Sequence, residues 1–170
     1  MTLTLRTCAV RSWHPSDVDS LTVHANNRNV AINLRDRFPS PYTRRDGREF
    51  IKMARRMKPE SFFAIAVGGE AVGGIGFVPG HDVERVSSEI GYWLGEAFWG
   101  RGIMTAAVRA TVEHLFRHFD FMRLEAPVFE WNPASMRVLE KCGFAREGVL
   151  RKSIEKDGQI IDAVLYARLR

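Results

Sequence analysis

The residues best suited to chemistry lie in a glycine-rich stretch at 95–105, which reads Gly-Glu-Ala-Phe-Trp-Gly-Arg-Gly-Ile-Met-Thr. It stands between an apolar run typical of a strand and a long stretch with helical periodicity. Backbone N–H groups at a turn that opens a helix point outward, and the helix dipole favours a negative charge there. Gly100 and Gly102 have no Cβ, so a phosphate can approach their main chain. The spacing therefore predicts an anion-binding loop.

Four interpretations of this loop compete. A Walker A loop needs Lys and Ser or Thr where the sequence has Arg101 and Gly102. A dinucleotide fingerprint needs a third glycine where Thr105 stands, and only one strand–helix–strand unit is present. The pyrophosphate of coenzyme A needs only the main-chain N–H groups. A tight turn that binds nothing is also compatible with a glycine pair.

The elements that must position this loop follow from the hydrophobic pattern and from turn signals. We expect strands at 8–13, 62–67, 71–78, 89–94, 124–129, 144–154 and 160–169. We expect helices from 14 to about 25, at 27–35, after Thr43, at 103–119 and at 133–142. The helix at 103–119 connects two strands that should be parallel neighbours, while the remaining strands should be antiparallel. The pattern predicts a mixed sheet with helices on both faces, in an α/β or α+β domain.

Three blocks of the chain carry a resemblance to a known family. They are Glu-Ile-Gly-Tyr-Trp-Leu at 89–94 with Phe-Trp-Gly-Arg-Gly at 98–102, Asn-Pro-Ala-Ser at 132–135 with Leu-Glu-Lys-Cys-Gly-Phe at 139–144, and Phe-Pro-Ser-Pro-Tyr-Thr at 38–43. Together they resemble the GNAT superfamily of N-acetyltransferases, and within it the RimJ/RimL type that acetylates ribosomal-protein N-termini. The resemblance covers residues 5–170 and implies one GNAT domain. Its sheet would have seven strands, mixed but mostly antiparallel, splayed between the fourth and fifth strands.

The resemblance implies acetyl-CoA as co-substrate and no metal. The loop would hold the pyrophosphate, and the backbone of Trp93 and Leu94 would align the pantetheine and polarise the thioester carbonyl. Asn132 would contact the pantetheine or thioester arm, cap its own helix, or do both. Arg101, Arg137 and Lys141 are candidates for the 3′-phosphate or are solvated cations. The expected acetyl-CoA residues are Trp93, Leu94, Trp99, Gly100, Arg101, Gly102, Ile103, Met104, Thr105, Asn132, Arg137 and Lys141.

The reaction implied by the resemblance is direct attack of a primary amine on the thioester, with no covalent enzyme intermediate. Glu89 is the candidate base, although water can suffice for an α-amine with a pKa near ~8. Many members of the superfamily have a tyrosine that acts as the general acid at the position where this chain has Leu139, so Ser135 is the candidate acid here. The acceptor would be a protein or peptide N-terminus or a small amine. The residues expected to border it are Arg35, Asp36, Phe38, Tyr42 and Tyr92.

The composition sets the remaining expectations. The 170 residues are 45% apolar and 26% charged, which is typical of one globular domain. No apolar run is long enough for a membrane span, and no secretory signal is recognisable, so we expect a cytoplasmic protein. Cys8 and Cys142 should stay reduced, with Cys142 in the core, and His114 and His118 lack the pattern of a metal site.

The net charge of +5 is concentrated at residues 28–58, which carry ten basic and three acidic side chains. Such a segment can attract nucleic acid, a ribosome surface or a phosphorylated small molecule, or it can be a solvated helix. No aromatic signature supports nucleic-acid binding. The alternative to an enzyme is a non-catalytic acyl-CoA-binding regulatory module. For the oligomeric state, the sequence is compatible with a monomer and with a homodimer.

Overall fold

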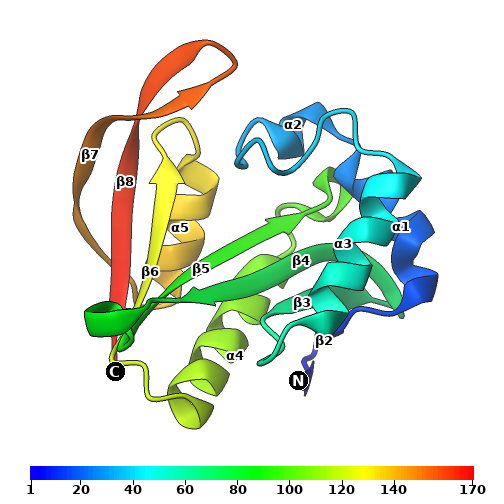
Figure 1. Cartoon of the computed structure of the whole chain (residues 1–170), viewed down its shortest axis with the longest axis horizontal. Coiled ribbons are helices and arrows are strands. Elements are labelled where there is room, and N and C mark those ends of the chain that lie inside the picture. The colour runs from blue at the N-terminus through cyan, green and yellow to red at the C-terminus, as the bar shows by residue number, and fades with distance from the viewer. The chain divides into compact units, whose positions relative to one another are not determined.

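The computed structural model describes residues 1–170, and these fall into two compact units (Figure 1). The first unit holds Met1–Gly76 and Gly91–Ala107, and the second holds Phe77–Ile90 and Val108–Arg170. Three elements contribute residues to both: β4 (Glu70–Pro79), β5 (Ser87–Leu94) and α4 (Ile103–His118). The expectation of a single acetyltransferase domain at 5–170 stays a prediction.

The first unit is built on antiparallel strands. These are β1 (Thr2–Thr4), β2 (Ala9–Ser12), β3 (Phe62–Val67) and the first part of β4. The register places Val10 opposite Ile65, and both side chains are completely buried. Gly68 and Gly69 connect β3 to β4 with φ of 58° and 89°, so the hairpin turn expected there is confirmed.

Helices pack against these strands in the first unit. They are the 3₁₀ turn η1 (Pro15–Asp17), α1 (Val18–Ala25), α2 (Arg28–Ala31), α3 (Arg44–Arg56) and the 3₁₀ turn η3 (Glu96–Phe98). Figure 1 shows α1 and α3 side by side. The sequence Thr-Arg-Arg-Asp at 43–46 predicts a capping box at the start of α3. It is confirmed, because Thr43 Oγ1 accepts from the Asp46 N–H and Asp46 accepts from the Thr43 N–H.

Two helix expectations are wrong. The helix α2 covers four residues rather than 27–35, because the side chain of Asn27 caps it and the chain turns away after Ala31. In α3 we expect an apolar series of Phe50, Met53 and Met57. Phe50 packs against the core, but Met53 and Met57 are exposed, and the fully buried residues are Gly47, Ile51 and Ala54. Gly47 allows the close approach: a Cβ there would lie 3.3 Å from Thr22 Oγ1 on α1.

A buried ion pair fixes the start of α1. Asp17 is 6% exposed, and its carboxylate accepts two hydrogen bonds from Arg11, at 2.7 and 2.9 Å, and one from the His14 N–H at 2.8 Å. Burial alone raises the pKa of the Asp17 carboxyl, but the bonds from Arg11 and His14 outweigh it, so the pKa lies below its ordinary value. The folded state therefore favours the charged form of this side chain.

We expect Asp17→Asn to lower the free energy of unfolding by about 2–3 kcal/mol at pH 7, because it leaves Arg11 half-buried without its partner. The folded pKa lies below the unfolded value near ~3.9, so the stabilisation is complete at neutral pH. It is lost as pH falls from about 4 through the folded pKa. Urea unfolding of wild type and variant at pH 7 and pH 3 measures the cost of the substitution and its loss at low pH. Asp19→Asn, which breaks an exposed pair with Arg44, should cost less than ~0.5 kcal/mol. Equal costs for the two variants would contradict the prediction.

The second unit contains a parallel pairing. Ser87–Glu89 of β5 pair with Arg123–Glu125 of β6 (Arg123–Phe129), as the crossover predicts. β6 then pairs along its length with β8 (Gln159–Leu169), which pairs with β7 (Ala145–Lys156), both antiparallel. Asp157 and Gly158 form the β7–β8 turn with φ of 52° and 74°, which confirms that hairpin. A short 3₁₀ turn, η2 (Asp82–Glu84), precedes β5.

The helices of this unit are α5 (Pro133–Lys141), which contacts β7, and the C-terminal part of α4. Along α4, Ala107, Val108, Val112 and Leu115 are completely buried, as the helical periodicity predicts. Cys142 is 3% exposed, so its expected place in the core is confirmed.

The strands follow one another in the hydrogen-bonded order β1-β2-β3-β4-β5-β6-β8-β7. The mixed, mostly antiparallel sheet is confirmed, but it has eight strands rather than seven. The additional strand is β1, a three-residue segment that offers one apolar position, Leu3 opposite Val10. A pattern this short has no periodicity to detect. The splay between the central strands stays a prediction.

Candidate functional site

The glycine loop is an open turn that leads directly into α4. Gly100 and Gly102 have φ of 72° and 73°, a conformation that side chains rarely adopt, and a Cβ on either would meet nothing within 4 Å. Gly102 immediately precedes α4 and has no side chain with which to cap it, and the first amides of an α-helix have no intrahelical acceptor. Open space above a left-handed turn, next to the first amides of a helix, fits a phosphate group.

The loop is held in place by hydrogen bonds to its neighbours in the first unit. The Gly95 N–H donates to the Val72 carbonyl at 2.8 Å, and the indole N–H of Trp99 donates to the Leu94 carbonyl at 2.7 Å. Arg101 lies 5.3 Å from the centre of the Phe98 ring. The end of β5 and the loop thus form one connected structure, in which the backbone of Leu94 is oriented by Trp99.

Sequence analysis misses the residues that tie this loop to α2. The side-chain amides of Asn27 and Asn29 donate to the Glu96 carboxylate at 2.7 and 2.9 Å, and Asn27 Oδ1 caps α2. The cap alone is recognisable from an Asn before a short helix. The bond to Glu96 joins residues 69 positions apart, and no local pattern signals it.

An aromatic cluster surrounds Trp93 at the end of β5. The ring of Phe38 lies 5.5 Å from Trp93 and 5.0 Å from Tyr42, between centroids. A Cβ at Gly74 on β4 would lie 2.8 Å from the indole nitrogen of Trp93, so only glycine leaves room for this ring. The structure therefore brings together two residues expected at the acceptor and one expected at the thioester.

Tyr42 is held rigidly in that cluster. It is 4% exposed, and its backbone N–H donates to Asn26 Oδ1 at 3.0 Å. Burial, with the charge of Asp46 nearby, raises the pKa of the Tyr42 hydroxyl well above its ordinary value. It stays protonated at any working pH. Of the other residues expected at the acceptor, Arg35 and Asp36 are exposed and Tyr92 is half-buried.

The second unit carries the other set of expected site residues. Asn132 caps α5, as predicted: its Oδ1 accepts from the Ser135 N–H at 3.1 Å. The side-chain NH₂ of Asn132 makes no hydrogen bond, and both Asn132 and Ser135 are half-buried. The cap therefore uses only one end of the Asn132 amide. The preceding residue, Trp131, has a buried indole N–H without an acceptor.

The rest of α5 divides into a buried and a charged face. Leu139 is completely buried, and its aliphatic side chain has no proton to donate. Arg137 and Lys141 are exposed and make no ion pair. They remain available for an anion, as the sequence predicts, or as solvated cations.

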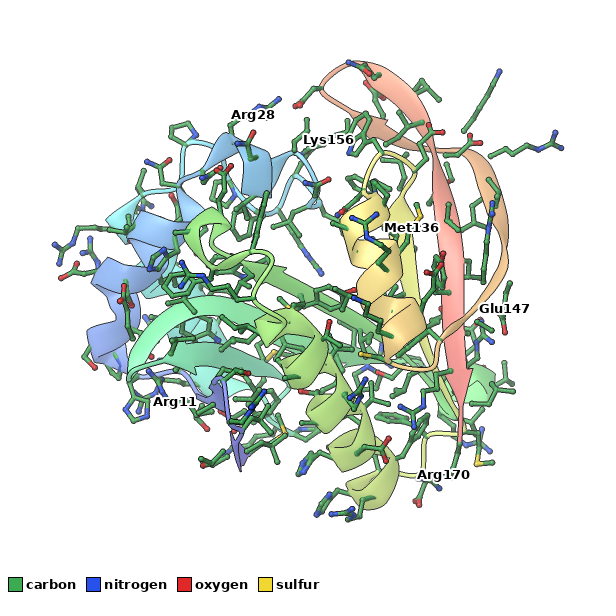
Figure 2. The ribbon with its side chains drawn as sticks, turned by 180° about the vertical axis from the view of Figure 1, so that it is seen from behind. Arg11, Arg28, Met136, Glu147, Lys156 and Arg170 are labelled. Atoms are coloured by element: carbon green, nitrogen blue, oxygen red, sulfur yellow. The ribbon has the colours of Figure 1, made fainter.

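Glu89 lies in the short parallel ladder of the second unit. It is half-buried and stands in register with Glu125 on β6. The Glu125 carboxylate accepts from Arg123 at 2.9 Å, and Arg123 also binds Glu147 on β7 at 2.6 Å. Figure 2 labels Glu147. Two carboxylates thus share one stretch of the sheet, and the arginine neutralises Glu125.

A metal-binding cluster and a membrane-spanning helix are two further features that side chains and helices can form. His114 and His118 stack with ring centroids 4.1 Å apart, but no group of three or more His, Cys, Asp and Glu side chains is arranged to hold a metal ion. No helix combines the length and the apolar character needed to cross a membrane.

Comparison with known proteins identifies the same pattern over most of the chain. A family model described as an acetyltransferase (GNAT) domain matches residues 8–145. The chain is 49% identical over 69 residues to the probable N-acetyltransferase YjcK of Bacillus subtilis, covering 41% of this chain and 38% of that protein. It is 32% identical over 97 residues to the ribosomal-protein-serine acetyltransferase of Escherichia coli, covering 56% and 54%.

A solved structure extends the likeness to the whole chain. RimJ of Mycobacterium smegmatis, in complex with CoA-disulfide, superposes with a TM-score of 0.86 at 25% identity, covering 99% of this chain and 86% of that one. By sequence, the matched segments span only 38–53% of the length of the first curated relatives.

Proposed function

The chain belongs to the GNAT family of acetyltransferases, and from this premise we propose that it transfers an acetyl group from acetyl-CoA to a primary amine. The observation that carries the proposal is the open turn at Gly100 and Gly102 immediately before α4. The relative in the RimJ structure holds a coenzyme A derivative. Acetyl-CoA supplies the activated acetyl group, and this chain supplies binding, orientation and proton transfer.

In this proposal different residues bind different parts of acetyl-CoA. Main-chain N–H groups of residues 99–105 bind the pyrophosphate, and the helix dipole of α4 adds to that attraction. The backbone of Trp93 and Leu94 lies along the pantetheine. The unused NH₂ of Asn132 donates to the pantetheine or thioester arm while its oxygen caps α5. Arg101, Arg137 and Lys141 serve the 3′-phosphate.

The transfer itself needs a neutral amine and a protonated leaving group. Glu89, directly or through water, takes a proton from the ammonium group of the acceptor. The amine nitrogen then bonds to the thioester carbon, and the carbon–sulfur bond breaks as the oxyanion collapses. Ser135 gives its hydroxyl proton to the departing thiolate, in place of the tyrosine that Leu139 replaces, and takes in return the surplus proton that the nitrogen loses as the amide forms. The products are the acetylated amine and free CoA.

We propose a protein or peptide N-terminus as the acceptor. The E. coli relative is named for a ribosomal protein, and the basic segment at 28–58 disfavours a polycation such as spermidine. Phe38 and Trp93, with the buried Tyr42 packed against Phe38, form the aromatic wall that would border the first residue of the peptide.

A panel of amines tests this function. Peptides with Ser, Ala or Met at the N-terminus, spermidine and an aminoglycoside are incubated with acetyl-CoA, and free thiol and acetylated product are measured. We expect release of CoA with at least one peptide, and none with the same peptide blocked at its N-terminus. Binding of acetyl-CoA without release of CoA on any acceptor would favour the regulatory module instead.

A further inference from the structure

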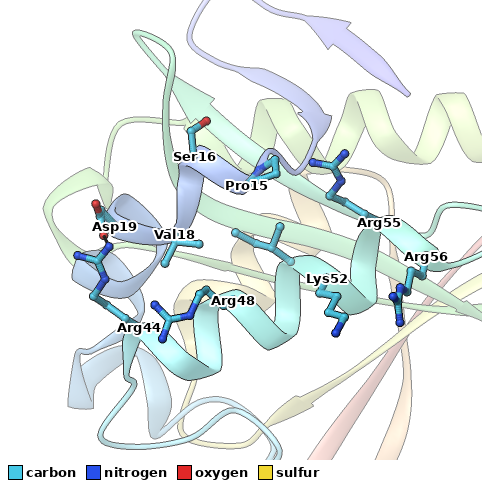
Figure 3. Close-up of a pocket in the computed structure, with 10 residues that line it drawn as sticks. Pro15, Ser16, Val18, Asp19, Arg44, Arg48, Lys52, Arg55 and Arg56 are labelled. Atoms are coloured by element: carbon cyan, nitrogen blue, oxygen red, sulfur yellow. Dashed lines mark ion pairs between the residues drawn. The ribbon is translucent and has the colours of Figure 1, made fainter.

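One side of α3 forms a groove with the start of α1, away from the glycine loop in the sequence. The groove is open, has a volume of about 700 Å³ and is shown in Figure 3. Its basic residues are Arg44, Arg48, Lys52, Arg55 and Arg56, and its other residues are Pro15, Ser16, Val18, Asp19 and Ile51. Five cations and one carboxylate therefore line a single depression.

Most of these cations have no partner within the protein. Arg44 pairs with Asp19 at 2.8 Å, and both side chains are exposed. Arg48, Lys52, Arg55 and Arg56 make no ion pair, and Figure 3 shows them along the same helix. Like charges three or four residues apart on a helix repel one another. An anion in the groove would remove this repulsion.

The spacing of the cations indicates an extended ligand. From Arg44 to Arg56 the helix rises about 18 Å, at 1.5 Å per residue. A single phosphate or carboxylate contacts only one or two of these side chains. A chain that carries several anionic groups, roughly one per helical turn, contacts them all.

The floor of the groove distinguishes between polyanions. Pro15 is exposed, Val18 is half-buried and Ile51 is buried, so the apolar surface that suits a partner with apolar side chains between its charges is offered by Pro15 and Val18. The bases of single-stranded nucleic acids are commonly held by stacking on exposed aromatic rings. The nearest aromatic residue on α3, Phe50, packs edge-on against Trp13 and Phe62 and is not available for stacking.

We propose that this groove docks an acidic segment of a polypeptide, whose carboxylates bind the cations of α3 and whose apolar side chains rest on Pro15 and Val18. Arginine suits this task because its planar guanidinium binds a carboxylate through two parallel bonds. This proposal does not depend on the proposed acetyl transfer, and the acidic segment can belong to the amine acceptor or to another polypeptide.

Fluorescence anisotropy tests the proposal with defined probes. The first is a labelled 20-residue peptide of Glu with Leu at every fourth position, the second replaces each Leu by Ser, and the third is a 20-nucleotide oligouridylate. The variant is Arg48→Gln/Lys52→Gln/Arg55→Gln. The matched control, Arg117→Gln/Arg151→Gln/Lys152→Gln, removes the same charge from exposed positions outside the groove.

At low salt we expect the groove variant to bind the Glu/Leu peptide about tenfold more weakly than wild type, and the control to bind it nearly as tightly as wild type. The affinity should fall as salt rises above ~0.15 M. The Ser-substituted peptide should bind wild type more weakly, because it lacks contact with the apolar floor. The proposal would be overturned if the two variants lost affinity for the Glu/Leu peptide equally, or if wild type did not bind this peptide at all. It would also be overturned if wild type bound oligouridylate more tightly than the Glu/Leu peptide and only the groove variant lost that binding.

Discussion

Replacing Gly102 by valine is expected to weaken acetyl-CoA binding by about 100-fold or more while the protein stays folded. A Cβ at Gly102 would stand in open space above the turn, and two further methyl groups would fill the place from which a phosphate reaches the amides of α4. Loss of one or two hydrogen bonds to a charged group costs about 3 kcal/mol, which corresponds to that factor. Isothermal titration calorimetry with acetyl-CoA measures it.

Backbone strain alone must be separated from loss of the binding surface. Gly102 has a φ of 73°, and Gly158 in the β7–β8 turn has a φ of 74° and equally open surroundings. Valine at either position costs about 1–2 kcal/mol of stability, so the two variants should have similarly lowered Tm. Only the variant at Gly102 should lose acetyl-CoA. Wild-type affinity in a folded Gly102→Val protein would exclude this loop as the phosphate site.

The features predictable from the sequence are those with local causes. The turn at Gly100 and Gly102, the cap at Asn132 and the hairpin at Asp157 and Gly158 each depend on a few adjacent residues. The helix α4 is long enough for its period to be unambiguous. For these elements the sequence and the structure agree in position as well as in type.

The features that sequence analysis misses depend on contacts between distant residues. Phe50, Met53 and Met57 are spaced as an apolar face, but only Phe50 packs against the core, and Met53 and Met57 are exposed. The buried residues beside Phe50 are Gly47, Ile51 and Ala54, and a Cβ at Gly47 would make a tight contact with α1. Helical period alone cannot decide which of these residues are buried.

The candidate site shows the same division. The glycine loop is recognisable in the sequence, whereas the support of that loop by Asn27, Asn29 and Glu96 is not. The packing of Phe38 against Trp93 depends on Gly74, on a third strand segment. The resemblance assigns Phe38 and Trp93 to the site separately, and only the fold brings their rings together.

The second large effect concerns the proposed acid. Ser135→Ala is expected to lower kcat by roughly tenfold to a thousandfold and to leave the Kd of acetyl-CoA nearly unchanged, because the hydroxyl acts on the departing sulfur. Leu139 is completely buried and offers no alternative donor. Ser153→Ala, an exposed serine on β7, is the matched control and should keep wild-type turnover. Steady-state release of CoA and calorimetry give both parameters.

The proposed base predicts a dependence on pH. Glu89→Gln should lower kcat/KM most at low pH, where the acceptor amine is mainly charged and must lose a proton before it attacks. Above the pKa of an α-amine, near ~8, the acceptor is already neutral and the variant should approach wild type. Glu125→Gln changes the carboxylate in register with Glu89, one already neutralised by Arg123, and should have a small, pH-independent effect. If Glu89→Gln and Ser135→Ala both keep wild-type turnover across this range, water or the backbone carries the proton transfers, and neither residue is catalytic.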